Sequence, residues 1–479
     1  MLHIPILRHG RPYRSADSVI LTHHATGEPV AEMSMANSGL IARDMQRSDP
    51  GVLERFRMAE LIAMFREAAR LFLEATLPIG MDQRGQSFED YLRQLSATTG
   101  MPISYCRNNA RKIHRVLDEI EPVLAGLMRG VSPETVDRGY GLQDGRMVSF
   151  LRRCRVFGAV LPSNSPGVHS LWIPAIALKT PIALKPGREE PWTPLRVITA
   201  LRAAGVPDSA FGFYPTDHGG AAELLRQADR SMLFGDASTT RPWASDPRVE
   251  LHGPGYSKVL LGDDCADDWP NYVDMIASSI AANGGRSCIN ASAVWTPRGG
   301  RQLAEALAQK LASITARPAD DPNAELAGFA NAATAEAINA SVSAGLREPG
   351  AEDVSARVRG GSRLARIGRV AYLLPTIVRC ERPDHPLANR EFLFPYASVV
   401  ECPTREMPER IGTTLIASVI TNEREFARRL MAAGNVDRLN LGAIPTWQIS
   451  WDQPHEGNLF EHLYRQRAFQ ISETLAEAV

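Results

Sequence analysis

The amino-acid sequence lacks the charge bias and the long apolar runs that mark several classes of protein. Its 53 basic and 54 acidic residues give a formal net charge of −1, so no basic excess favours nucleic acid and no block of charge favours a membrane surface. No apolar run approaches the roughly 18 residues of a membrane-spanning helix. Residues 1–19 also lack the unbroken apolar stretch of a signal peptide. We therefore expect a cytoplasmic protein that acts on neither nucleic acid nor membranes.

Paired cysteines and the common phosphate-binding motifs are also missing. The six cysteines are scattered through the chain without a Cys-x-x-Cys pair. We therefore expect no disulfide framework and no metal site, as suits a reducing compartment. Neither Gly-x-Gly-x-x-Gly nor Gly-x-x-x-x-Gly-Lys-Ser/Thr lies between a predicted strand and a predicted helix, so a nucleotide would need another kind of site.

What the sequence does contain is a regular alternation of strands and helices between residues 155 and 261. The apolar runs predict strands at residues 156–161, 181–184, 211–214, 231–234 and 258–261. The segments between them predict helices at residues 168–178, 191–204 and 218–227, the last with Asp217 as its N-cap. This rhythm is typical of a parallel, doubly wound sheet.

The flanking segments complete the expected α/β organisation. Residues 18–34 predict a hairpin, and residues 38–129 predict helices. A second α/β unit is expected to end near residue 442, with surface loops at 316–323 and 358–363.

The candidate nucleophile is Cys288, which follows a predicted helix within a glycine-rich turn. Arg286, two residues earlier, is expected to favour the thiolate form that attacks carbonyl carbons. Gly284 and Gly285 allow a tight turn that brings backbone N–H groups close to a substrate oxygen. A single cysteine in a globular chain is more often a small buried apolar residue, so the rest of the sequence must decide.

Three further segments carry weaker signals. Lys185 ends a predicted strand, where a lysine binds ribose or phosphate groups or is simply solvated. Gly235 and Ser238 lie in a glycine turn followed by hydroxyl residues, which suits either a pyrophosphate or an ordinary helix cap. Asn164 lies in a proline-broken turn, where its amide either stabilises an oxyanion or serves only the turn.

In order and spacing these segments resemble the aldehyde dehydrogenase superfamily over nearly the whole chain, as a divergent member. The similar segments are residues 25–32, 162–166, 185–186, 234–238, 283–288, 391–395 and 414–421. The resemblance implies a Rossmann-like cofactor domain, a second α/β catalytic domain and a small β oligomerisation element. On this basis residues 1–252 form the cofactor domain, with a possible oligomerisation hairpin near 138–154. Residues 253–445 form the thiol domain, residues 446–479 the C-terminal return, and the chain a homodimer or homotetramer.

The resemblance also implies a mechanism, in which Cys288 attacks an aldehyde to give a thiohemiacetal. The Asn164 amide and the Cys288 backbone N–H hold the oxyanion, hydride passes to NAD or NADP, and a thioester remains on Cys288. Lys185 would hold the adenosine ribose and Glu391 the nicotinamide ribose. The remaining implied cofactor contacts are Pro186, Gly235, Ser238 and Phe392.

The sequence departs from the family where the thioester is cleaved. Residues 249–255 stand in place of the family's Glu-Leu-Gly-Gly-Lys, so Glu250 falls on the glutamate that activates water, while the lysine and one glycine are missing. Residues 253–255 are similar to the acylating branch and to acyl-CoA reductases, in which coenzyme A replaces water. Three hypotheses stay open: a hydrolytic dehydrogenase, a CoA-dependent enzyme with Glu250 as a mere strand-end carboxylate, and an inactive scaffold.

Two other departures concern the ligands. Arg188 stands where the family often has a glutamate for the ribose hydroxyls, which favours NADP slightly over NAD. Residues 454–458 replace the family's Phe-Gly-Gly-x-Lys-x-Ser-Gly segment, and His455 there is either a contact for substrate or CoA or a loop histidine. The sequence alone does not indicate which aldehyde is used.

Overall fold

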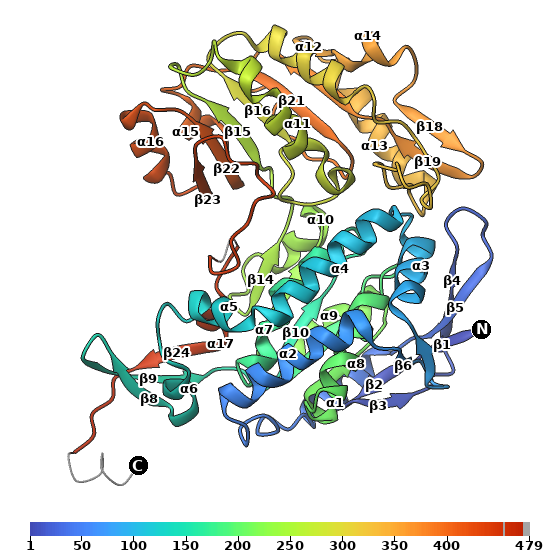
Figure 1. Cartoon of the computed structure of the whole chain (residues 1–479), viewed down its shortest axis with the longest axis vertical. Helices are drawn as coiled ribbons and strands as arrows, with labels where there is room; N and C mark the ends of the chain where they lie inside the picture. Colours follow the sequence, from blue (N-terminus) through green and yellow to red (C-terminus); the bar gives the residue numbers. More distant parts are fainter. Residues whose placement is uncertain (454–455, 473–479) are drawn as a thin grey trace.

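The computed structural model describes residues 1–453 and 456–472, and it contains two seven-stranded sheets, each covered by its own helices (Figure 1). His455 lies outside the described residues. The predicted α/β fold class is confirmed. The strand ends of the two sheets face each other across the region in which the thiol segment lies.

The first sheet has the strand order β14-β13-β10-β11-β12-β2-β3. Its strands are β14 (Val249–His252), β13 (Arg230–Phe234), β10 (Phe157–Val160), β11 (Ile182–Lys185), β12 (Phe211–Phe213), β2 (Ile6–Arg8) and β3 (Arg11–Tyr13). The five strands from β14 to β12 run parallel, while β2 and β3 extend the sheet in antiparallel fashion. Four of the five predicted strands, now β10, β11, β12 and β13, thus lie in one parallel sheet, which gains an N-terminal edge that the sequence did not indicate.

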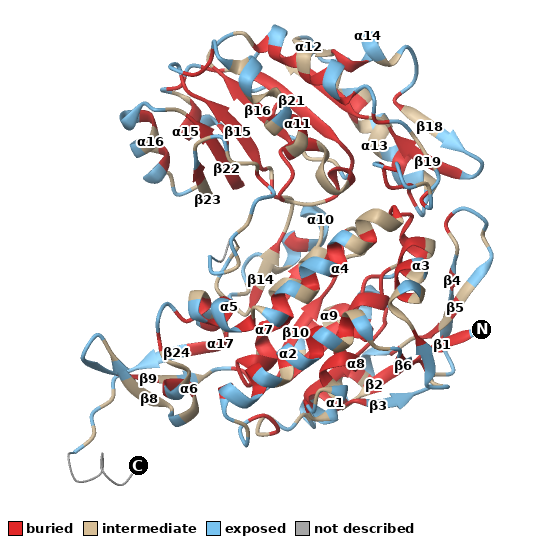
Figure 2. Cartoon of the chain, in the orientation of Figure 1, coloured by how far each residue is buried: buried red, intermediate tan, exposed pale blue. Residues whose placement is uncertain are grey.

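Both faces of the first sheet are buried, and successive residues of β10 alternate between two apolar cores (Figure 2). On one face the core includes α2 (Met58–Glu74), α3 (Phe88–Thr99), α4 (Ile103–Asp118), α5 (Ile120–Leu127), α7 (Pro174–Ala177) and α8 (Trp192–Ala203). On the other face it includes α1 (Ser38–Gln46) and α9 (His218–Gln227). Asp217 caps α9 as predicted, because its carboxylate accepts the N–H of Gly220 at 2.9 Å.

Short helices fill the connections of this unit, and they explain one difference from the prediction. They are α6 (Pro133–Arg138), α10 (Ala237–Thr240), and the 3-10 turns η1 (Pro166–Leu171), η2 (Asp208–Ala210) and η3 (Arg241–Trp243). The helix predicted at residues 168–178 is split between η1 and α7. Pro174 lies at the break, where it has no backbone N–H to continue the helical ladder.

The second sheet has the strand order β17-β20-β21-β16-β15-β22-β23. Its strands are β17 (Ala351–Asp353), β20 (Thr376–Cys380), β21 (Tyr396–Glu401), β16 (Ala293–Thr296), β15 (Lys258–Leu261), β22 (Thr414–Ile420) and β23 (Val436–Leu441). The prediction that residues 258–261 continue the first sheet was wrong, because β15 pairs with β16 and β22 at the centre of the second. An apolar run predicts a buried strand, but it does not specify the sheet.

Helices cover both faces of the second sheet as well. One core contains α11 (Val273–Ala281) and α12 (Gly300–Leu311), and the other contains α13 (Ala332–Gly345), α15 (Met407–Arg410) and α16 (Arg424–Met431). The smaller elements are η4 (Trp269–Tyr272), η5 (Ala282–Gly285), α14 (Ser355–Arg359), β18 (Leu364–Ile367) and β19 (Val370–Leu373).

Besides the two-stranded sheet of β18 and β19, three small sheets lie outside the two large ones in the described part of the chain. Their strands are β1 (Leu2–Ile4), β5 (Pro29–Ser34) and β4 (Ser18–Thr22); β6 (Leu77–Ile79) and β7 (Arg84–Gln86); and β24 (Tyr464–Arg467), β9 (Arg146–Arg152) and β8 (Tyr140–Gln143). The predicted hairpin at residues 18–34 is present as β4 and β5. The β6–β7 hairpin interrupts the region predicted to be entirely helical. The expected hairpin near 138–154 is present, and the C-terminal helix α17 (Leu459–Leu463) leads into the strand that completes its sheet.

Candidate active site

The segment before Cys288 adopts a backbone that only a glycine-rich sequence accommodates. Asn283, Gly284 and Gly285 all have positive φ angles, of 54°, 66° and 68°. A Cβ atom on Gly285 would lie 2.3 Å from the carbonyl carbon of Phe394, so the thiol loop packs directly on the backbone next to Glu391. The Asn283 amide oxygen accepts from Asn109 of α4 at 2.8 Å, which ties the turn to the first unit.

Cys288 is the one cysteine of the six that is not fully buried. It lines two cavities, of about 510 and 520 Å³, which also share Ser165, Phe234 and Ser287. Desolvation raises the pKa of its thiol well above the usual range, and the negative charges of Glu456 and Glu391 raise it further. The thiol is therefore protonated at neutral pH in this state.

Arg286 does not favour the thiolate in the way that the sequence suggested. Its guanidinium donates to the backbone oxygens of Ala327 and Gly328, at 3.2 and 3.0 Å, and lies over the Phe329 ring. Burial lowers its pKa to about 10. Closeness in sequence gave the wrong expectation, because the Arg286 side chain binds the backbone of residues 327–328 instead of facing the sulfur.

Asn164 lies beside the thiol loop. Its Nδ2 group donates to the backbone oxygen of Arg286 at 2.9 Å, and the residue lines the 510 Å³ cavity together with Cys288. A side-chain amide has two N–H bonds. One bond therefore fixes the orientation of the amide, and the other remains for a ligand oxygen.

The structure divides the predicted cofactor residues into two groups. Gly235, Glu391 and Phe392 line the 510 Å³ cavity, as do Asp236 and Thr239, which the prediction did not include. The described residues that line this cavity do not include Lys185, Pro186 or Ser238. Lys185 ends β11, where burial lowers its pKa. Ser238 donates to Asp236, and Arg188 lines a neighbouring cavity of about 430 Å³.

Glu391 is held by backbone groups on the cavity wall. The N–H of Tyr256 donates to its carboxylate at 2.6 Å. Burial raises the pKa of Glu391, and backbone hydrogen bonds oppose this only in part, so that the pKa is about 7. The nearby ammonium of Lys258 is also buried, which lowers its pKa to about 7.

Glu250 is directed away from the described walls of both cavities that contain Cys288. It lines a separate, smaller cavity, and its carboxylate oxygen lies 2.0 Å from the place where a Cβ of Gly457 would be. Gly457 is therefore needed for this close approach. The structure brings Glu250 to the C-terminal segment rather than to the sulfur.

The sequence reasoning missed His252 and Glu456, which do reach the site. His252 Nε2 lies 3.3 Å from Glu250, and Nδ1 lies 2.9 Å from Glu456, although neither contact has the angles of a good hydrogen bond. Burial lowers the pKa of His252, but the two carboxylates outweigh it and raise the pKa to about 9. The imidazole stacks on Phe234 at 4.4 Å. The one signal in the sequence was a histidine in place of the first glycine of the family motif.

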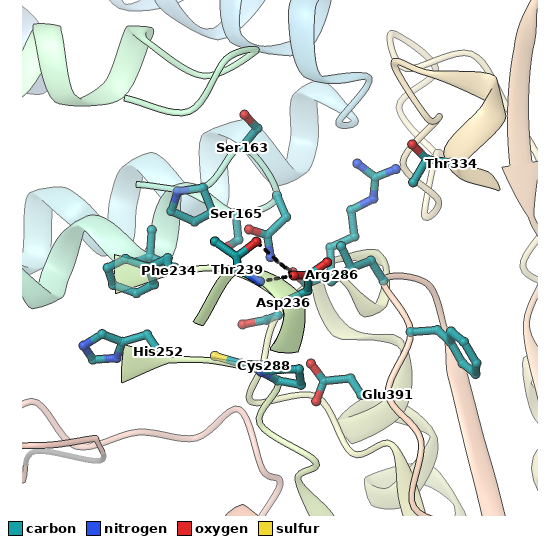
Figure 3. A pocket seen from close by; sticks show the side chains of 18 of the residues that line it. Ser163, Ser165, Phe234, Asp236, Thr239, His252, Arg286, Cys288, Thr334 and Glu391 are labelled. Carbon is teal, nitrogen blue, oxygen red and sulfur yellow. Dashed lines mark hydrogen bonds between the residues drawn. The ribbon is translucent and has the colours of Figure 1, made fainter. Parts of the chain in front are cut away.

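Figure 3 shows how His252, Phe234 and Glu391 lie around the nucleophile. The sulfur of Cys288 points toward the side of the cavity that holds His252 and Phe234, and Glu391 lies on the other side. Glu456 lines the 520 Å³ cavity together with Cys288. The thiol of Cys288, the amide of Asn164 and the carboxylate of Glu391 line the 510 Å³ cavity together, and this combination suits acyl chemistry.

The sequence model of the aldehyde dehydrogenase family matches residues 82–456. The chain belongs to this family. It is accordingly an oxidoreductase that acts on aldehydes. A curated relative, the aminoacetaldehyde dehydrogenase of Pseudomonas aeruginosa, is 25% identical over 410 residues, which cover 79% of this chain and 74% of the relative.

Solved structures share the fold over almost the whole chain. An NAD-dependent aldehyde dehydrogenase from Sinorhizobium meliloti has a TM-score of 0.78 at 19% identity, with 97% of this chain and 94% of that chain covered. An indole-3-acetaldehyde dehydrogenase of P. syringae, solved with NAD+ and IAA, has a TM-score of 0.78 at 16% identity, with 98% and 96% covered. Of the helices in the described part of the chain, none is both long and apolar enough to cross a membrane.

Proposed function

We propose that this enzyme oxidises its aldehyde through a covalent thioester on Cys288. The observation that carries the proposal is the position of Cys288, the one partly accessible cysteine, in a cavity that also contains the oriented amide of Asn164. The other five cysteines are buried, which leaves them no access to a substrate. The inactive-scaffold hypothesis has less support, because the thiol, the amide and the cavity are all retained.

The first half-reaction uses groups on both sides of the thiol loop. The sulfur forms a bond to the carbonyl carbon, and the electrons of the carbon–oxygen π bond move onto the oxygen. The free N–H of Asn164 and the backbone N–H of Cys288 stabilise that oxyanion. Because the thiol begins protonated, a neighbouring carboxylate must accept its proton, and Glu456 and Glu391 are the two that act on its pKa.

The residues present fit a nicotinamide dinucleotide. The 510 Å³ cavity runs from Cys288 to the segments that follow the carboxyl ends of β10 and β13, and a Cβ on Gly187 would lie 2.4 Å from the Pro162 oxygen, so the backbone forms a close cradle. We propose that Glu391 accepts ribose hydroxyls and that Lys185 contacts the adenosine half. A bound NAD or NADP supplies the acceptor for the hydrogen and electron pair that the carbon loses. Arg188, in its neighbouring cavity, leaves only a slight preference for NADP.

For the second half-reaction we propose Glu456, rather than Glu250, as the base. Glu456 lines the 520 Å³ cavity beside Cys288, and His252 holds it as a positioning residue. Any proton that Glu456 took from the thiol first passes to solvent, and the ionised carboxylate then accepts a proton from the water whose oxygen attacks the thioester carbon. The carbon–sulfur bond then breaks, and sulfur leaves as the thiolate.

A CoA-dependent reaction remains the second candidate, and the orientation of Glu250 favours it. If neither carboxylate activates water, coenzyme A takes the acyl group and needs no such base. The position of Glu250 outside both cavities is expected for that branch.

Rapid mixing of the enzyme with aldehyde and with NAD or NADP, in buffer with and without CoA, distinguishes these possibilities. We expect reduced cofactor to form in wild type and in Cys154→Ala, and none to form in Cys288→Ala. Reduction that persists in Cys288→Ala contradicts the covalent proposal. Acyl-CoA formation with no acid product assigns the enzyme to the CoA-dependent branch.

The domain division, assembly and location also remain proposals. We propose a cofactor domain at residues 1–252, a thiol domain at 253–445 and a C-terminal return at 446–479, in a cytoplasmic enzyme. The sheet of β8, β9 and β24 exposes Leu142, Met147 and Leu151, which supports assembly into a homodimer or homotetramer through this element. Light scattering of wild type and Leu142→Asp measures the assembly directly.

A further inference from the structure

The 520 Å³ cavity is the more informative of the two for the substrate, because its walls differ in chemistry. One wall contains Trp447, Ile449 and Trp451, which are apolar and partly aromatic. Another part of the lining is α4, the helix that follows the β6–β7 hairpin and α3 in the first unit (Figure 1). A flat or extended apolar body fits between these walls.

The face that α4 presents to the cavity is polar and basic. Its lining residues follow helical spacing along one stripe, and they are Tyr105, Asn108, Asn109, Lys112 and Arg115. The opposite stripe of the same helix is buried in the apolar core. The cations of this stripe therefore line a ligand cavity as well as facing solvent.

The two cations of the stripe are not equivalent. Arg115 donates to Glu119 at 2.9 Å, so its charge is balanced within the helix. In the part of the chain that the structure describes, no carboxylate lies within ion-pair distance of the Lys112 ammonium. The Lys112 side chain is exposed, although protein around its ammonium group lowers its pKa through desolvation.

The cavity is also polarised along its length. Asn109 bonds to Asn283 in the thiol loop, so this part of α4 marks the end near Cys288. Lys112 follows Asn109 by three residues, or about 4.5 Å along the helix axis. Glu456 contributes a negative charge at the Cys288 end. An anionic group is therefore repelled from the sulfur and attracted toward Lys112.

We propose that the substrate is an aldehyde with an apolar body and an anionic group at the end remote from the carbonyl, and that Lys112 binds this group. The inference rests on the proposed function, since it places the carbonyl at Cys288. Lys112 is a specificity-determining residue in this arrangement. The polarity of the cavity directs the carbonyl, rather than the anion, toward the nucleophile.

The test compares matched aldehydes that differ only in the remote group. The first pair is adipic semialdehyde and hexanal, and the second pair is para-carboxybenzaldehyde and para-methylbenzaldehyde. The aldehyde with a phosphonate in place of the carboxylate of para-carboxybenzaldehyde serves as a second anion. We expect wild type to prefer each anionic aldehyde in kcat/KM, and Lys112→Gln to lose at least about tenfold for the anionic member alone. Lys112→Arg should retain the preference, and Lys112→Glu should reverse it.

Lys310→Gln is the matched control, because Lys310 is an exposed lysine of α12 paired with Asp274, far from this stripe. It should leave both members of each pair unchanged. Equal losses for anionic and neutral aldehydes in Lys112→Gln overturn the proposal, as does a changed KM for CoA with an unchanged KM for the aldehyde. Either of these outcomes would overturn the role of Lys112 and leave the proposed function intact, since oxidation of hexanal through Cys288 tests that function separately.

Discussion

The Nδ1 atom of His252 lies 2.9 Å from the carboxylate of Glu456, and this contact joins the first sheet to the C-terminal segment beside Cys288. The histidine is cationic at neutral pH, because the carboxylates of Glu456 and Glu250 raise its pKa to about 9 despite burial. Only one of these carboxylates also faces the sulfur. The residue aligned with the family glutamate, Glu250, and the carboxylate that shares a cavity with Cys288, Glu456, are thus different residues in this chain.

The first prediction compares the two carboxylates. Glu456→Gln should slow release of the acyl group by on the order of a hundredfold, because the base for water is lost. Glu250→Gln, the matched control, should retain most of the rate. Quenched-flow mass spectrometry should show acylated Cys288 accumulating in the first variant alone, and accumulation only in Glu250→Gln contradicts the assignment.

A second prediction concerns the reactivity of the thiol in the free enzyme. Desolvation and two negative charges raise the pKa of Cys288, so alkylation by iodoacetamide should be slow at neutral pH and rise with pH. Glu456→Gln removes one of these charges, so it should lower the pKa and accelerate alkylation at a given pH. A slower alkylation in this variant would show that the carboxylate does not act electrostatically on the thiol.

The third prediction concerns the pH dependence of cofactor binding. Glu391 has a pKa of about 7, so it is protonated below this pH and ionised above it. The ionised carboxylate accepts hydroxyl donors more strongly, so calorimetric affinity for NAD or NADP should increase between about pH 6 and about pH 8. Glu391→Gln should remove this dependence. The Lys258 ammonium titrates in the same range, so Lys258→Met provides the comparison that separates the two groups.

A fourth prediction uses adjacent glycines of the thiol loop. Both have positive φ, but a Cβ on Gly284 has no neighbour nearer than 3.4 Å, whereas one on Gly285 meets Phe394 at 2.3 Å. Gly284→Ala should therefore cost about 1 kcal/mol of unfolding free energy, and Gly285→Ala should cost more. Thermal unfolding measures both variants. Cofactor affinity should fall only in Gly285→Ala, since the clash displaces the segment that contains Glu391.

Much of the fold and the thiol site could be predicted from the sequence, because these features are local. Apolar runs predicted most strands, and the turn around Gly284 and Gly285 has its own signature. The sheet that contains residues 258–261 and the β2–β3 edge could not be predicted, since both depend on pairing between distant segments. His252 and Glu456 were missed for the same reason. They lie 204 positions apart in the sequence, and nothing between them signals that a charged pair will form.

The hydrogen bond from Asn164 to the backbone of Arg286 has a consequence for the enzyme as a whole. The donor belongs to the unit of the first sheet, and the acceptor belongs to the unit that contains the nucleophile. In the proposed mechanism, the amide reaches the substrate oxygen only while the two units are in contact. The proposed chemistry therefore depends on contact between the two units, and a chain whose halves have separated would carry the thiol without the amide proposed as its oxyanion donor.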